Sequence, residues 1–138
     1  FVCESELLSA FAGLEPGRAY RWRYDWSACN IGGDFPFMAC SEAGVVSEPL
    51  VAEAAADKLR LKGRFGVFSP GELQAVLLDA RGRKLETTDL GLRASPWQPV
   101  VLDNTLDLPA RAARVSVRLQ PAHGKRGQEL ASADIQVR

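Results

Sequence analysis

Alternation of apolar and polar residues is the feature of this sequence that most constrains its fold. It is clearest in residues 20–26 (YRWRYDW) and returns in residues 59–68 and 113–121. Because successive side chains of a strand point to opposite faces, the pattern predicts strands with one buried face. Residues 73–90 predict a hairpin that bends at residues 79–84 (DARGRK).

Two more segments extend the pattern, residues 96–109 with their prolines and a last strand over residues 130–138. The alanine-rich stretch SEPLVAEAAADK is compatible with one short helix near residues 49–57, and residues 4–13 fit a helix or a strand. Short strands, glycine and proline turns and almost no helix predict a single all-β domain spanning residues 1–138. We expect an antiparallel β-sandwich of jelly-roll type with at most one short helix.

Composition is that of an ordinary globular protein, with 46% hydrophobic and 25% charged residues in a chain of 138. A formal net charge of zero gives no reason to expect nucleic acid or an acidic membrane as partner. No apolar run approaches the roughly 20 residues that span a bilayer, so we expect no membrane insertion of this segment. We recognise no signal peptide, and both ends look cut, which predicts a fragment of a larger protein.

The cysteines admit two interpretations. A disulfide between Cys29 and Cys40 would close a loop of about ten residues, stabilise the fold by about 2–3 kcal/mol, and imply an oxidising, extracytoplasmic compartment. Cys3 would then be free or paired with a cysteine elsewhere. The alternative is three free, buried thiols. We expect the bridge, and no zinc site, because the single histidine, His123, lies far along the chain.

Four stretches, in order, resemble the galactose-binding-like jelly rolls, a family that includes many carbohydrate-binding modules. The family's gL-x-PG-x-x-Y turn is matched at Leu14, Pro16, Gly17 and Tyr20. LLDARGRKL resembles its v-x-D-x-x-G hairpin. Its tryptophan-containing run is matched at Trp97, Pro109, Val115, Val117 and Leu119, and its closing D-D-v-x-l strand at Asp134.

The resemblance implies a jelly-roll sandwich that binds carbohydrate, but two departures stand out. The strands that open the family's domain are largely absent, and the insert at residues 28–58 is long. Family members often carry a structural calcium near the termini, to which the closing aspartate pair contributes. Ala133 replaces the first of that pair and leaves only Asp134, so we expect no cofactor.

The four aromatic rings of residues 20–26 would share one face of a strand. Large rings dominate core energetics, whereas four exposed rings would form an adhesive patch, so we expect Tyr20, Trp22 and Tyr24 in the core. For Trp26, at the end of the strand, core packing and sugar stacking are both open. Trp97 stands between two prolines, where structural packing competes with ligand stacking.

The loop NIGGDFPF supplies further candidates. Asn30 and Asp34 could bond sugar hydroxyls, Phe35 and Phe37 could stack, and the paired glycines allow close approach, although such residues form turns by default. Arginines facing away from the rings could add to a basic face for an acidic glycan or partner, or simply be solvated. This face would hold Arg21, Arg23, Arg60, Lys62, Arg64, Arg114 and Arg118.

No nucleophile motif, phosphate loop or metal cluster accompanies these residues, so we expect no enzyme. The expected function is a non-catalytic, extracytoplasmic carbohydrate-binding module, either periplasmic, secreted or at the cell surface. The alternative is a structural or protein-interaction domain of a larger cell-envelope protein, in contact with its other domains. The candidate ligand-binding residues are Trp26, Asn30, Asp34, Phe35, Trp97, Arg21 and Arg23. Clustered, exposed rings would favour the first function and buried rings the second.

Overall fold

The computed structural model describes residues 10–33, 36–122 and 126–137. Five features of the sequence analysis fall wholly or partly outside these residues: Cys3, the first part of residues 4–13, Asp34, Phe35 and His123.

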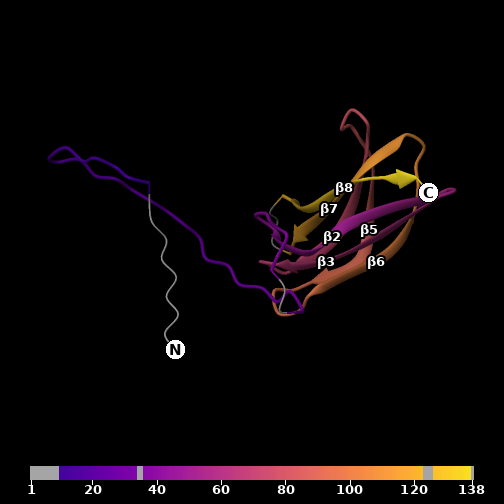
Figure 1. The fold of residues 1–138 in the computed structure, drawn as a ribbon, viewed down its shortest axis with the longest axis horizontal. Coiled ribbons are helices and arrows are strands. Elements are labelled where there is room, and N and C mark those ends of the chain that lie inside the picture. Colours follow the sequence, from indigo (N-terminus) through magenta and orange to yellow (C-terminus); the bar gives the residue numbers. More distant parts are fainter. Residues whose placement is uncertain (1–9, 34–35, 123–125, 138) are drawn as a thin grey trace.

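Two β-sheets pack face to face and enclose one core (Figure 1). Sheet 1 runs in the order β1 (Ala39–Cys40), β2 (Gly44–Ala55), β3 (Lys58–Val67), β6 (Val100–Asp107), and the short β9 (Gln136–Val137) pairs in parallel with β2. Sheet 2 runs β5 (Lys84–Ala94), β4 (Gly71–Asp79), β7 (Ala112–Pro121), β8 (Gln128–Asp134). All other pairings are antiparallel, and no helix occurs in the described residues. The predicted all-β sandwich is confirmed.

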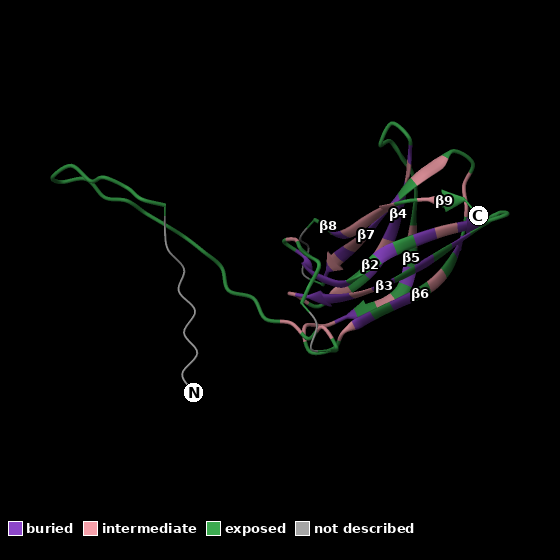
Figure 2. Cartoon of the chain, in the orientation of Figure 1, coloured by how far each residue is buried: buried purple, intermediate pink, exposed green. Residues whose placement is uncertain are grey.

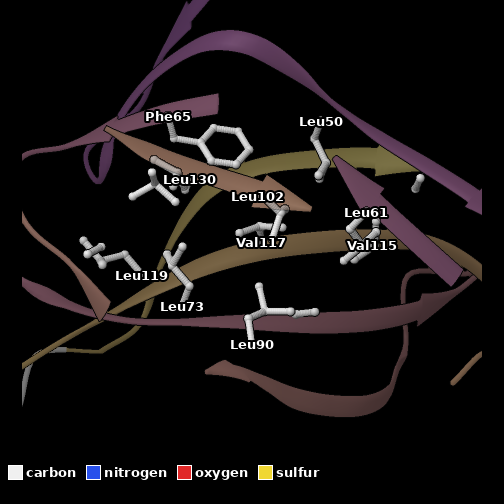
Figure 3. Close-up of a cluster of buried hydrophobic side chains, with 14 of the residues drawn as sticks. Leu50, Leu61, Phe65, Leu73, Leu90, Leu102, Val115, Val117, Leu119 and Leu130 are labelled. Atoms are coloured by element: carbon white, nitrogen blue, oxygen red, sulfur yellow. The ribbon is translucent and has the colours of Figure 1, made fainter. Parts of the chain in front are cut away.

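The core follows from the alternation. On β3, Leu59, Leu61 and Phe65 are fully buried, while the charged residues between them face out. The same banding of buried and exposed positions runs along the other long strands (Figure 2). Both sheets contribute to the cluster in Figure 3, which includes Leu50, Leu61, Phe65, Leu73, Leu90, Leu102, Val115, Val117, Leu119 and Leu130.

Most predicted strands are present. Residues 59–68 become β3, the hairpin of residues 73–90 becomes β4 and β5, and residues 113–121 become β7. The last predicted strand is divided into two. β8 belongs to sheet 2, and beyond Ile135 the chain crosses to sheet 1 as β9.

The predicted helix near residues 49–57 is wrong, because this stretch forms the second half of β2. Ala52 and Ala54 are buried opposite Leu61 and Leu59 of β3. Pairing with a strand and burial of every second residue outweigh the high intrinsic helix propensity of alanine, which tertiary contacts often override.

The prediction that residues 20–26 form a core strand is also wrong. Residues 10–27, here called the arm, fold back at a turn after Glu15 and contain no strand, and most of the arm extends away from the sandwich (Figure 1). At its base, Asp25 and Ser27 line a hollow together with Phe68 and Pro121. All four rings are exposed, by 42% at Trp22 to 68% at Trp26. Neither sheet takes the arm as a neighbour, so its rings have no core to enter.

The hairpin between β4 and β5 is closed by one carboxylate. Asp79 Oδ1 accepts hydrogen bonds from the backbone N–H groups of Arg81 and Arg83, both at 2.9 Å. Its Oδ2 accepts one from Arg83 Nε at 2.7 Å. The backbone bond from Arg83 is the main reason that the pKa of Asp79 is lowered from its usual 3.8.

Replacing this carboxylate, by Asp79→Asn, is expected to lower the melting temperature at neutral pH. A folded-state pKa below the unfolded value adds stability above pH 3.8, and that stability is lost as the pH falls through the folded pKa. The variant should therefore also lose less of its melting temperature between neutral and acid pH. Thermal unfolding followed by circular dichroism at several pH values measures both effects. Parallel pH profiles for the two proteins would contradict this role.

Candidate binding site at the loop end of the sandwich

One end of the sandwich holds the two longest connections, residues 95–99 and 122–127. The turns after β1, β3, β5 and β7 all lie there, because those strands end where β2, β4, β6 and β8 begin. The opposite end holds shorter turns, such as the two residues Ala56 and Asp57. We call the first end the loop end, and the chain joins the sandwich there through residues 29–33.

This joining segment lies on the outer surface of sheet 1. A Cβ atom added at Gly66 of β3 would lie 2.7 Å from Cys29 Sγ and 3.1 Å from Ile31 Cγ2. Only a glycine leaves room for the segment to pack so close to the strand. Gly66 therefore positions the segment beside the turn between β5 and β6.

Asn30 fastens the segment to that turn. Its backbone N–H donates to Pro96 O at 2.8 Å, and its side-chain Nδ2 donates to Trp97 O at 3.2 Å. Its Oδ1 accepts a hydrogen bond from the Gly32 backbone at 2.8 Å. The predicted role of Asn30 in bonding sugar hydroxyls thus changes, since both ends of its amide hold backbone groups. It is a positioning residue for Trp97.

Arg64 supports the same turn from β3. Its Nη1 donates to Gly32 O at 3.2 Å, and its Nε lies 3.0 Å from Glu48 Oε1 on β2. Gly32 has a φ of 76°, and an added Cβ would lie 2.9 Å from Pro99 Cγ. Position 32 therefore requires glycine for two reasons, the backbone conformation and the lack of space for a side chain.

Trp97 is the most exposed ring of the loop end, with 81% of its surface accessible. Its backbone is held on three sides: its N–H donates to Ser95 Oγ at 3.3 Å, its carbonyl accepts from Asn30, and Gln98 bridges back to Ser95. Beside it lies a shallow hollow of about 510 Å³. The hollow is lined by Ala28, Cys29, Asn30, Ile31, Gly33, Pro96 and Trp97. Trp97 therefore does not serve as interior packing, which was the structural alternative for it.

A second, polar hollow at the loop end was not anticipated from the sequence. It measures about 590 Å³ and lies over the start of β8, where Gln128 Nε2 donates to Glu42 at 3.4 Å and Ser116 Oγ donates to Glu129 at 2.7 Å. Arg118 donates to Gly127 O at 2.9 Å. No motif connects these residues in the sequence, because four separate elements supply them.

Among the described residues, the other predicted ligand residues do not join Trp97, whereas Asp34 and Phe35 lie outside the described residues. Trp26, Arg21 and Arg23 all lie on the arm, where Arg23 is 3.5 Å from Asp25. The arm rings are not coplanar, since Trp22 and Tyr24 are inclined at 41° and Tyr24 and Trp26 at 68°. A flat sugar platform on the arm is therefore not formed.

The hypothesised basic face does not assemble either. Arg60, Lys62 and Arg64 lie on the outer face of sheet 1, whereas Arg114 and Arg118 lie on sheet 2. Acidic partners also compensate the first set: Arg60 binds Asp103 at 3.1 Å, and Glu48 binds Arg64. The outer face of sheet 1 is thus a mixed-charge surface.

The Cys29–Cys40 bridge is not formed, and both are free thiols. Cys40 is exposed on β1, whereas Cys29 is half-buried against Gly66. Burial, followed by the nearness of Cys40, raises the pKa of the Cys29 thiol above 9.0. The Cys29 thiolate therefore forms less readily than that of an ordinary cysteine.

Alkylation with iodoacetamide at pH 8 is expected to modify Cys40 several-fold faster than Cys29, since only the thiolate reacts. The rate at Cys29 should keep rising above pH 9, because its thiolate forms there. Peptide mass spectrometry resolves the two sites, and Cys40→Ser should remove the faster reaction of this pair. A Cys29–Cys40 disulfide peptide in the freshly purified protein would contradict the expectation.

No group of three or more His, Cys, Asp or Glu side chains suited to a metal occurs in the part of the chain that the structure describes. Within the same residues there is no helix long and apolar enough to cross a membrane. The fold and site together define an all-β sandwich with an exposed tryptophan at its loop end. Comparison with protein-family models, with curated proteins and with solved structures finds no match to this chain.

Proposed function

We propose that this protein is a non-catalytic carbohydrate-binding module in which the Trp97 ring stacks on a sugar. One observation carries the proposal: Trp97 is 81% exposed although its backbone is fixed by hydrogen bonds to Ser95 and Asn30. Because the backbone that carries the ring is already fixed, it need not be ordered when a ligand covers the ring, and this part of the entropic cost of binding is avoided. The sequence resemblance to galactose-binding-like jelly rolls supports the same function.

The chemistry of the hollow favours a neutral sugar over an acidic one. Its lining is mostly apolar side chains and backbone, and the nearest guanidinium, that of Arg64, is already bound to Glu48 and Gly32. The proposal includes an extracytoplasmic location, where polysaccharide ligands are found. It includes no catalytic residue and no cofactor.

A glycan array that contains neutral and acidic polysaccharides tests the proposal. Wild type should bind at least one neutral glycan, and Trp97→Ala should weaken that binding by roughly tenfold to a hundredfold, the range for loss of a central aromatic contact. Trp26→Ala is the matched control, because it removes an exposed ring of the same kind from the arm. Equal losses in the two variants, or no binding by folded wild type, would overturn the proposal.

A second candidate is a protein-interaction domain of a larger cell-envelope protein. The observation that favours it is the arm, whose four exposed rings form no part of the core. The edges of the two sheets indicate what kind of partner the arm could bind.

A further inference from the structure

The arm has the composition of a half-buried strand without a sheet to bury it. Tyr20, Trp22, Tyr24 and Trp26 alternate with Arg21, Arg23 and Asp25. Such a sequence is suited to add itself to an open sheet edge, where backbone hydrogen bonds give affinity and alternate side chains give register. The question is which edge fits it.

Strand β6 is the edge whose side chains complement the arm. It forms one border of sheet 1 and pairs only with β3 among the described residues. Its inward row holds Val100, Leu102 and Leu106 together with the polar Asn104. Its outward row carries Asp103 and Asp107, which already pair with Arg60 and Lys58 of β3, so an arginine of the arm would join an existing ion pair. Hydrogen bonds from Arg60 lower the pKa of Asp103, so this carboxylate is charged at neutral pH.

The other edges are less suitable. Strand β5 is irregular, with a register shift opposite β4 and a positive φ of 66° at Gly91. Irregularities of this kind blunt an edge against pairing. Strand β1 has only two residues, and β8 packs beside β2.

We propose that the arm pairs as an antiparallel strand with β6 of a second copy of this chain, and that the two copies exchange arms reciprocally. This proposal rests on the second candidate function, the protein-interaction domain, and gives a second copy of the chain as its partner. It does not depend on the sugar site at Trp97.

One pairing register between the arm and β6 places suitable residues opposite each other on both faces of the sheet. With Arg23 opposite Asp103, the ring of Tyr24 lies beside Leu102 and that of Trp26 beside Val100. On the outer face Arg21 then falls between Asp103 and Asp107. A shift of two residues toward the start of the arm would place Asp25 opposite Asp103, and like charges directly opposite are destabilising. Of these two registers, the pattern favours the first.

A second copy is favoured over the same chain because the arm points away from its own sandwich (Figure 1). Reciprocal exchange creates a closed, two-fold interface, the commonest kind of homodimer. The eight rings are about half exposed and would bury roughly 600–1,000 Å². The inward residues of β6 are already buried and have little area to lose, so the rings supply most of the buried surface. The total is therefore below the roughly 1,200–2,000 Å² of a standard interface, and backbone hydrogen bonds of the added strand must supply further affinity.

Light scattering after size exclusion, over a range of concentrations, measures the assembly without any variant. Wild type should be a dimer, and Trp22→Ser combined with Tyr24→Ser should raise the dimer dissociation constant by on the order of a hundredfold or more. Trp97→Ala should remain dimeric. Monomeric wild type would overturn the proposal, whatever glycans it binds. If the double variant instead keeps its glycan binding, the Trp97 site stands separately.

Cysteine cross-linking tests the register. In a background of Cys3→Ser, Cys29→Ser and Cys40→Ser, the pair Arg23→Cys and Asp103→Cys should form an intermolecular disulfide on mild oxidation. The control pair Asp25→Cys and Asp107→Cys lies at distant positions in this register and should not. A monomer with an internal 23–103 disulfide would show that the arm folds onto its own β6, and no disulfide would show another partner. Either result contradicts exchange between copies.

Discussion

Truncation of Phe65 to alanine should lower the free energy of unfolding by about 3–5 kcal/mol, the usual cost of removing a buried phenylalanine ring. Phe65 is fully buried in β3, paired with Val46 of β2 and Val100 of β6. Its ring covers Gly63, where an added Cβ would lie 2.7 Å from Phe65 Cζ. The ring therefore fills space between the two sheets. Its removal would leave a cavity that neighbouring side chains cannot easily fill.

Urea unfolding followed by circular dichroism measures this loss, because the three tryptophans are exposed and do not report on the core. Small domains are stable by about 5–15 kcal/mol, so the variant should be near the limit of folding. Phe37→Ala is the matched control, because Phe37 is 58% exposed and its loss should cost below about 0.5 kcal/mol. Similar midpoints for the two variants would mean that Phe65 does not lie in the core.

Gly44→Ala should have the second large effect, a destabilisation of at least about 1–3 kcal/mol from overpacking. An added Cβ at Gly44 would lie 2.0 Å from Gly66 O and 2.9 Å from Val67 Cα. Both are backbone atoms of β3, so no side-chain rotation relieves the clash. The first residues of β2 and the end of β3 must separate.

The separation would reach the loop end. The Gly44 carbonyl accepts the Ser41 N–H at 2.8 Å, and the neighbouring Ala43 carbonyl accepts the Phe68 N–H at 2.9 Å. Gly13→Ala is the control, since nothing lies within 4 Å of a Cβ added there. Denaturant midpoints of the two variants measure the difference in stability. Equal midpoints would show that β2 and β3 are not in close contact at Gly44.

Strands whose two faces differ in chemistry could be predicted from the sequence alone. β3 and β7 alternate leucine, valine and phenylalanine with arginine and lysine, and that contrast determines which face is buried. The hairpin between β4 and β5 was also predictable, because its bend is rich in residues that form turns. The structure of these segments can therefore be predicted from their own residues.

β2 and the arm could not be predicted in this way. In β2 the buried residues include Ala52 and Ala54, which differ little in polarity from their neighbours, so the sequence of this stretch resembles that of a helix. Only the pairing with Leu61 and Leu59 of β3 shows that it is a strand. The arm has a clear strand pattern, but whether a strand enters a core depends on neighbours that lie far away in the sequence. The position of a ring is a property of the whole fold.

The candidate site was predictable only in part. Trp97 and Asn30 were predicted separately as ligand residues, and the structure joins them by a hydrogen bond between residues 67 positions apart. The role of Asn30 was not predictable, because its partners are backbone atoms that any residue would supply. The polar hollow at Glu42 and Gln128 was missed because its side chains come from four separate elements that no sequence motif connects.

Fluorine NMR of protein labelled with 5-fluorotryptophan tests the central claim most directly, since the chain contains three tryptophans, Trp22, Trp26 and Trp97. Single substitutions assign the three signals. On titration with a glycan that the array identifies, the account predicts that the Trp97 signal shifts and saturates, while the signals of Trp22 and Trp26 stay in place. Saturating shifts at the arm tryptophans with an unmoved Trp97 would contradict the account and place the sugar site on the arm.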